Sequence, residues 1–198
     1  MTITAATTIV SVRDLIGDPY SERWTDADLL KWITDGLREM ATIRPAIFGA
    51  SGTELSHVLA AGCKQRLTAA NAFQIVSVDY NVASGKAIRL ITGSQLDAFR
   101  PGWRADIAAD VQNWFPDGED QLSFWVYPAV AGATVSVHAH ITPAAVTTTA
   151  AVVLPYDQYA PVLVNYVCFR AFSRDVEYGG NQAAAQAYYA LFTAALKG

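Results

Sequence analysis

The chain has 198 residues, of which 52% are hydrophobic and only 16% are charged. This length suits one domain of ordinary size, or one domain that carries an insertion. The charged fraction is well below the roughly 25% of an average soluble protein, which indicates that other subunits cover part of the surface. The net charge of −4 argues against nucleic-acid binding by phosphate neutralisation, because that mechanism requires clustered Lys and Arg.

The cysteines, the first residues and one charge-free segment bear on the cellular compartment of the protein and on membrane insertion. Cys63 and Cys168 are far apart and form no CxxC pair, so we expect reduced, buried thiols in a reducing compartment. The first residues lack a basic region followed by an apolar one, so no signal peptide is expected. Residues 121–156 contain no Asp, Glu, Lys or Arg. Prolines interrupt this span and polar residues alternate through it, so lipid would leave backbone groups unsatisfied. We expect no membrane segment.

Two helices are expected before residue 45. The first covers Thr8 to Leu15 and stops before Gly17-Asp18-Pro19, because Gly caps a helix and Pro cannot continue one. The second begins after Thr25, which forms a capping-box pattern with Asp28, and ends before Pro45. Its apolar side chains recur at helical spacing; they are Leu29, Leu30, Ile33, Leu37 and Met40.

From Glu54 onward the pattern changes to short segments rich in β-forming residues. Residues 73–80 and 88–91, on either side of a turn at 83–86, predict a hairpin. A short helix is expected from Ser94 to Phe99. Further strands are expected at 112–115, 122–127 and 134–141. Consecutive strands joined by tight turns predict an antiparallel sheet or small barrel.

The last part of the chain returns to helical patterns. Residues 141–154 predict an extended connector. A helix is expected after Tyr156, with Asp157 as its N-cap and Pro161 in its tolerant first turn. Gly179-Gly180 interrupts the pattern, and Asn181 is expected to cap a final helix. Two helices with so short a loop predict an antiparallel hairpin.

These elements predict an α+β fold. The N- and C-terminal helices form one bundle, and an antiparallel β-sheet or barrel-like region is inserted between them. The expected divisions are residues 1–53 for the N-terminal helices, 54–141 for the β-rich insertion, 142–154 for the connector and 155–198 for the C-terminal helical hairpin.

The sequence contains few residue patterns that are typical of a reactive site. His138 and His140 lie two residues apart on a predicted strand, and so on one face, as a metal pair requires; two half-exposed strand histidines are the plainer interpretation. His57 lies six residues before Cys63, which suggests a base and nucleophile only weakly. The chain has no zinc, calcium, nucleophile-elbow or phosphate-binding motif. We therefore expect no catalytic residue, metal or cofactor.

The aromatic residues are more informative. Trp32 falls between the apolar stripe of its helix and the acidic positions Asp35 and Glu39, where it suits either a core rim or an anchor at a subunit contact. Asp35 and Glu39 repel each other at i, i+4 spacing, a cost that a facing cation of an oligomer would offset. The turn from Arg100 to Trp103 predicts either a packed corner or a contact with a neighbouring chain.

Several segments resemble, in order, the head-to-tail adaptor proteins of tailed bacteriophages. They are VRDLIGD (12–18), WTDADLLKWITDG (24–36), GKAIR (85–89), LD (96–97) leading into RPGW (100–103), FWVYP (124–128), and YVCFRAFSRDVEY (166–178) with GN (180–181) and YY (188–189). The likeness covers most of the chain. Cys168 departs from it, since an aliphatic residue is expected there.

The resemblance implies a non-catalytic structural subunit without a cofactor. Such adaptors form a ring, typically of twelve copies, beneath the portal protein, and a tail component docks below. It implies a place in the virion at the head–tail junction, synthesis in the cytoplasm of the bacterial host, and double-stranded DNA that passes through the lumen without sequence-specific binding. A neutral or acidic lumen wall would let that DNA slide.

We expect nine residues at subunit or partner contacts: Trp32, Asp35, Glu39, Arg100, Trp103, Trp125, Tyr127, Arg170 and Arg174. Two other functions stay open. One is another neck or tail structural protein, such as a stopper or tail terminator. The other is a glycan-binding module or hydrolase that uses the aromatic β region.

Overall fold

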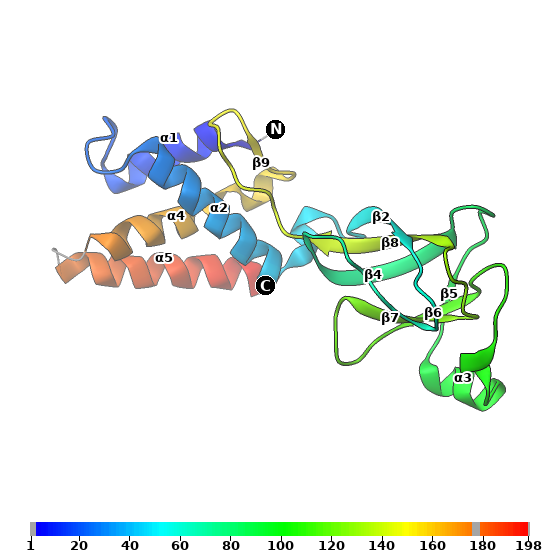
Figure 1. Ribbon diagram of the computed structural model, residues 1–198. Helices are drawn as coiled ribbons and strands as arrows, with labels where there is room; N and C mark the ends of the chain where they lie inside the picture. The colour runs from blue at the N-terminus through cyan, green and yellow to red at the C-terminus, as the bar shows by residue number, and fades with distance from the viewer. Residues whose placement is uncertain (1–2, 176–178, 198) are drawn as a thin grey trace. The chain divides into compact units, whose positions relative to one another are not determined.

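The computed structural model describes residues 3–175 and 179–197 (Figure 1). The chain divides into two compact units. The helical unit runs up to Phe48 and resumes at Pro143, and the β unit is Gly49–Thr142. The predicted α+β fold, a bundle of terminal helices with a β-rich insertion, is confirmed (Figure 1).

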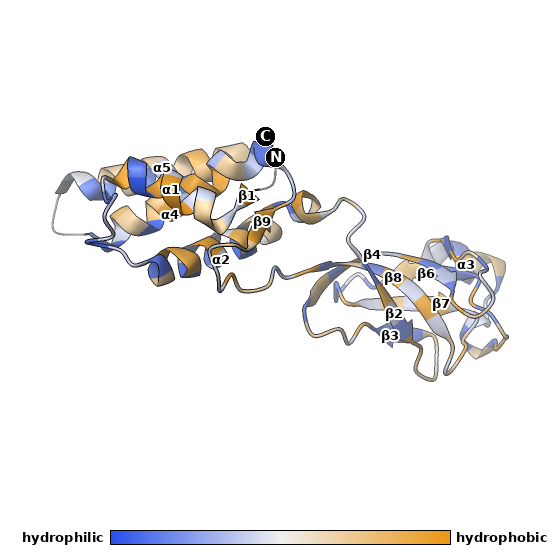
Figure 2. Cartoon of the chain, turned by 90° about the horizontal axis from the view of Figure 1, so that it is seen from above, coloured by the Kyte–Doolittle hydropathy of each residue, from blue (hydrophilic) through white to orange (hydrophobic). Residues whose placement is uncertain are grey.

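In its described residues the helical unit contains the α-helices α1 (Ala5–Ile16), α2 (Asp26–Ile43), α4 (Ala160–Arg174) and α5 (Gly179–Lys197). Helix α4 contacts each of the other three. Apolar and hydrophilic residues alternate along these helices (Figure 2), which is the pattern of a surface helix with one face in the core. The short turn η1 (Pro45–Phe48) follows α2.

Capping boxes start both N-terminal helices. The predicted box of α2 is confirmed, because the Asp28 amide donates to the Thr25 hydroxyl at 3.2 Å and the Thr25 amide donates to the Asp28 carboxylate at 3.3 Å. Thr4 and Thr7 form the corresponding box of α1. That box was not predicted, so α1 begins at Ala5, three residues before the expected Thr8.

One hydrophobic core fills the bundle. Gly36 lets α2 approach α4 closely, since a Cβ atom at this position would lie 2.7 Å from a ring carbon of Tyr166. The strand β1 (Ile3–Thr4) pairs antiparallel with β9 (Val152–Leu154). Before β9, the Val146 amide donates to the Thr34 hydroxyl at 2.9 Å, which fixes the connector to α2. The most deeply buried residues of this core include Leu29, Ile33, Met40, Leu163, Val167 and Phe192.

The C-terminal hairpin differs from the prediction at both helix starts. Asp157 opens the single turn η3 (Asp157–Tyr159), and α4 follows with Pro161 in its first turn. Helix α5 begins at Gly179, so Asn181 lies inside it. The Asn181 amide donates to the backbone oxygen and the carboxylate of Asp175, at 3.0 and 2.9 Å. Asn181 therefore ties α5 to the end of α4.

The β unit contains two sheets. In one, β8 (Thr134–Ile141) lies between β2 (Thr53–Val58) and β4 (Ala72–Asn81). In the other, the order is β3 (Lys64–Arg66), β7 (Ser123–Tyr127), β6 (Asn113–Pro116) and β5 (Arg89–Leu90). The β5–β6 pair is parallel, and the remaining strand pairs are antiparallel. Thr53 faces Ala139 across β2 and β8, so the chain enters and leaves the first sheet on adjacent strands.

The predicted hairpin of residues 73–80 with 88–91 is confirmed only next to its turn, and its longer pairing is wrong. Strand β4 pairs with β8, and it meets the following segment only near the Tyr80–Ala87 bridge. The Ile88 amide still donates to Asp79, but the Arg89 amide donates to Gln112 on the other sheet. The segment therefore crosses between the sheets while Ile88 enters their shared core. Strands β6, β7 and β8 and the short helix α3 (Gly93–Phe99) lie within a residue or so of their predicted places.

Candidate interaction sites

The nine residues expected at contacts fall into two groups, one in each unit. The helical group lies on α2 and α4 and comprises Trp32, Asp35, Glu39, Arg170 and Arg174. The β group lies around the short turn η2 (Trp103–Ala105) and on β7, and comprises Arg100, Trp103, Trp125 and Tyr127.

The two acids of the helical group find partners in their own chain. Asp35 Oδ2 lies 3.6 Å from Arg170 Nη2. The Tyr189 hydroxyl donates to Glu39 Oε1 at 2.8 Å, and this bond raises the pKa of Tyr189. The repulsion between Asp35 and Glu39 is thus relieved within the bundle.

Trp32 is a core residue of the helical unit, with 1% of its surface exposed. Its ring packs edge-to-face against Trp24, with 5.1 Å between centroids. The guanidinium of Arg174 lies 5.9 Å from the Trp32 ring, while Arg174 itself is exposed. The arginine, more than the indole, faces outward.

An ion network centred on buried Arg13 and Asp18 holds the loop between α1 and α2. Arg13 donates to the Asp18 carboxylate at 3.1 Å and to the Asp26 carboxylate at 2.7 Å. Asp18 also accepts backbone bonds from Glu22 and Trp24. Burial favours a higher pKa for Asp18, but these backbone bonds and Arg13 outweigh it and lower the pKa. The VRDLIGD segment therefore has a structural role that the sequence alone did not reveal.

Trp103 is the centre of the β group and is fully buried. Its ring packs edge-to-face with Phe115, Trp125 and Tyr127, at centroid distances of 5.8, 5.9 and 6.3 Å. Its indole nitrogen donates to Asp97 at 2.8 Å. A buried indole with a satisfied N–H is a stable anchor for the loop that carries it.

A bidentate ion pair closes that loop. Arg100 Nε and Nη2 lie 2.7 and 3.1 Å from the two carboxylate oxygens of Asp106. Arg100 holds the pKa of Asp106 below its usual value, against the effect of desolvation. We call residues 99–107 the Trp103 loop. Its ends carry Phe99 and Ile107, which are 84% and 83% exposed.

The histidines and cysteines do not assemble into a reactive site. His138 Nδ1 lies 2.7 Å from Asp79, whereas the His140 ring stacks on Phe73. The Cys63 thiol donates to the Arg104 carbonyl at 3.5 Å, and burial raises its pKa despite Arg104. His57 Nε2 is buried without a hydrogen-bond partner. Within residues 3–175 and 179–197, no three His, Cys, Asp or Glu side chains could hold a metal ion.

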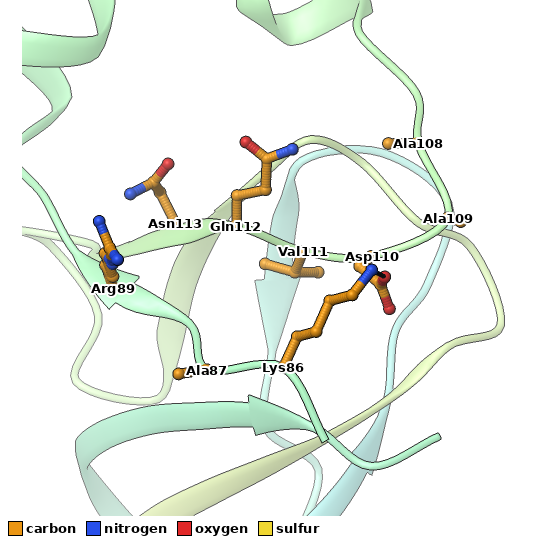
Figure 3. Close-up of a pocket in the computed structure, with 9 residues that line it drawn as sticks. All are labelled: Lys86, Ala87, Arg89, Ala108, Ala109, Asp110, Val111, Gln112 and Asn113. Atoms are coloured by element: carbon orange, nitrogen blue, oxygen red, sulfur yellow. Dashed lines mark hydrogen bonds and ion pairs between the residues drawn. The ribbon is translucent and has the colours of Figure 1, made fainter. Parts of the chain in front are cut away.

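Sequence reasoning missed a polar hollow of about 460 Å³ in the β unit. One wall is the segment from Lys86 to Arg89, and the other runs from Ala108 to Asn113 (Figure 3). Lys86 pairs with Asp110 across it at 2.7 Å. Arg89, Gln112 and Asn113 lie together at its other end (Figure 3). The only signal in the sequence was the GKAIR segment, which marked a resemblance but not a site.

Residues 3–198 match the family model of the SU10 adaptor proteins. The chain belongs to this adaptor family. The predicted resemblance to phage head-to-tail adaptors is therefore confirmed. A comparison with curated proteins gave no significant match. The family match covers both units of the adaptor, including the Trp103 loop and the polar hollow.

Among the described helices of the adaptor, none combines the length and apolar character needed to cross a membrane. The interface role of the nine residues stays a prediction. Its exposed members are Arg100 and Arg174, and Asp35, Glu39, Trp125, Tyr127 and Arg170 are half-buried.

Proposed function

We propose that this adaptor is a non-catalytic structural subunit that forms a ring between the portal and the tail of a tailed phage. The ring, of twelve copies by the resemblance, gives the tail component a docking platform and gives DNA a channel. The proposal places the protein in the virion at the head–tail junction, after synthesis in the bacterial cytoplasm. The observation that carries it is the family match over residues 3–198.

The surface supports assembly. Only 16% of the residues are charged, and large apolar side chains such as Tyr20, Phe99 and Ile107 are more than 80% exposed. Exposed apolar side chains are candidates for burial at protein interfaces. The net charge of −4 suits a channel whose wall does not bind phosphates.

The experiment is a mass measurement of the purified adaptor alone and with the portal protein. We expect a ring-sized species that contains portal. A stable monomer that does not bind the portal protein would contradict the proposal. Co-purification with the tail tube instead would identify a stopper or tail terminator. Glycan binding lost in Trp125→Ala with assembly intact would identify the glycan-binding alternative; buried Trp103 has no free face for a sugar.

A further inference from the structure

The β unit, which the structure describes in full, pairs nearly all of its charged side chains internally. Two of them, Arg89 and Glu119, have no hydrogen bond or ion pair to any described residue. The others form the pairs Lys64–Asp117, Arg66–Asp120, Lys86–Asp110, Arg100–Asp106, Arg104–Asp97 and His138–Asp79, and Glu54 accepts from Tyr80 and Ser136. Arg89 is thus the one cation, and Glu119 the one anion, of the β unit whose side chain has neither a hydrogen bond nor an ion pair to a described residue.

The free cation lies in the polar hollow. Because Asp110 neutralises Lys86, Arg89 gives the hollow its net positive charge. The side-chain amides of Asn113 and Gln112 lie one after the other on the same side of Arg89 (Figure 3) and, within the described chain, make no hydrogen bond. A guanidinium beside two amide donors suits a carboxylate, which accepts several hydrogen bonds at once.

Buried Asn81 fixes the walls of the hollow. Its amide nitrogen donates to the carbonyls of Val111 and Lys86, at 2.8 and 3.1 Å, and its oxygen accepts from the Val111 amide at 2.9 Å. The Arg89 amide also donates to Gln112 at 2.9 Å. The hollow is therefore formed before any ligand arrives, which lowers the entropy cost of binding.

The turn that carries Glu119 is also held in place by its neighbours. Glu119 lies in the turn between β6 and β7, and its neighbours Asp117 and Asp120 pair with Lys64 and Arg66. Asp120 also accepts from the Leu122 amide and the Ser123 hydroxyl, which with Arg66 lower its pKa to about 2. Glu119 contributes to the field at Lys64 but is exposed and unbonded.

Arg89 and Glu119 belong to opposite ends of β6. Arg89 faces Asn113, the first residue of β6, whereas Glu119 follows its last residue, Pro116. Four strand residues alone span about 10 Å. The two side chains therefore do not meet within one chain, but different patches on two copies can meet in a head-to-tail contact, the kind that closes a ring.

We infer that Glu119 of one copy binds in the Arg89 hollow of the neighbouring copy. The inference rests on the proposed ring and names one of its subunit contacts. The Glu119 carboxylate pairs with the Arg89 guanidinium and accepts from the Gln112 and Asn113 amides. Every Asp, Glu, Lys and Arg side chain of the β unit then has a hydrogen bond or an ion pair.

A charge swap tests the contact. Arg89→Glu and Glu119→Arg place like charges together, so each should raise the adaptor concentration needed for ring assembly by about tenfold or more. The double variant Arg89→Glu/Glu119→Arg restores the attraction and should recover most of the loss. Assembly is measured by mass photometry of the adaptor with portal. Lys31→Glu and Glu22→Arg, exposed residues with the same charge changes, are the matched controls.

The outcomes separate the contact from the proposed function. Rings that tolerate both single variants overturn the contact and leave the ring in place. A loss of ring assembly in Arg89→Glu that the double variant does not recover also overturns the contact. In that case the hollow binds an acidic side chain of another protein or a DNA phosphate. A wild-type chain that never assembles overturns the ring together with the contact.

Discussion

Asp18 is a carboxylate held inside the protein, with 3% of its surface exposed. Its charge is stabilised by Arg13 and by backbone amides of the loop before α2. An asparagine at this position has the same shape but no charge and one acceptor oxygen fewer, so Arg13 keeps only Asp26 as its anionic partner and buried donors lose an acceptor.

Asp18→Asn should therefore lower the free energy of unfolding by about 1–3 kcal/mol. Asp14→Asn is the control, since Asp14 is exposed and, in the described part of the chain, unpaired; its effect should stay within about 0.5 kcal/mol. Chemical denaturation followed by circular dichroism measures both. Equal, small losses would show that the network contributes little.

His57 makes stability depend on pH. Burial lowers its pKa, so the unfolded chain takes up a proton at a higher pH than the folded chain does. Stability is then unaffected above the unfolded pKa of about 6.5 and decreases as the pH falls below it. His140 shifts in the same direction for the same reason.

We expect His57→Leu to be less sensitive to acid than the wild type between about pH 6.5 and 5. The leucine is apolar and the lost Nε2 atom had no hydrogen-bond partner. Thermal melts across this range measure the difference, and His140→Leu tests the second histidine. Parallel stability curves for His57→Leu and the wild type would refute the assignment.

At the scale of elements, the local signals were reliable and the long-range ones were not. The limits of α2 followed from Thr25, Asp28 and Pro45, all within or next to the helix. The partner of β4 did not, because β8 is far along the chain and residues 88–91 offered a closer strand-like pattern. Strands β2 and β3 also went unpredicted, since their segments, TELSHV and KQR, contain few apolar residues or none.

For the candidate sites too, local features were predictable from the sequence and long-range contacts were not. The sequence indicated Asp35 and Glu39 as a repelling pair, but the Tyr189 hydroxyl that bonds Glu39 is 150 residues away. No local pattern pairs such residues. The polar hollow was missed for this reason too, because its walls come from two separate segments that β5–β6 pairing, Asn81 and the Lys86–Asp110 pair join only in the folded chain.

Gly52 is a turn residue that the β2–β8 pairing requires. Its φ of +72° is unfavourable for other residues, and a Cβ atom there would lie 2.7 Å from the Ala139 carbonyl oxygen. Gly85 has a similar φ of +68° but open space around it. Both alanine variants should lose stability through backbone strain, and Gly52→Ala should lose about 1–3 kcal/mol more through the clash. Urea denaturation compares them; matching losses would exclude the clash.

At the scale of the whole molecule, the exposed apolar residues distinguish folding from assembly. Phe99 and Ile107 contribute little to the fold because they are largely solvated. The Arg100–Asp106 pair and buried Trp103 keep the loop between them rigid. Rigid, exposed apolar side chains are good anchors at an interface.

Phe99→Ser/Ile107→Ser should therefore melt within a few degrees of the wild type but assemble poorly with its neck partners. Tyr20→Ser, equally exposed in the helical unit, is the comparison variant. Differential scanning fluorimetry reports folding and particle yield reports assembly. Normal yield with both variants would remove the Trp103 loop from the candidate interfaces.

The adjacent strands β2 and β8 have a consequence for how such proteins diversify. Thr53 and Ala139 stand opposite each other, so the chain leaves the bundle after Phe48 and returns at Pro143 through neighbouring positions. Recombination can therefore exchange the intervening segment as a cassette whose two ends already lie together. The bundle core keeps its own residues in every such chimera. The surface of the exchanged segment can therefore change with its partner without disturbing that core.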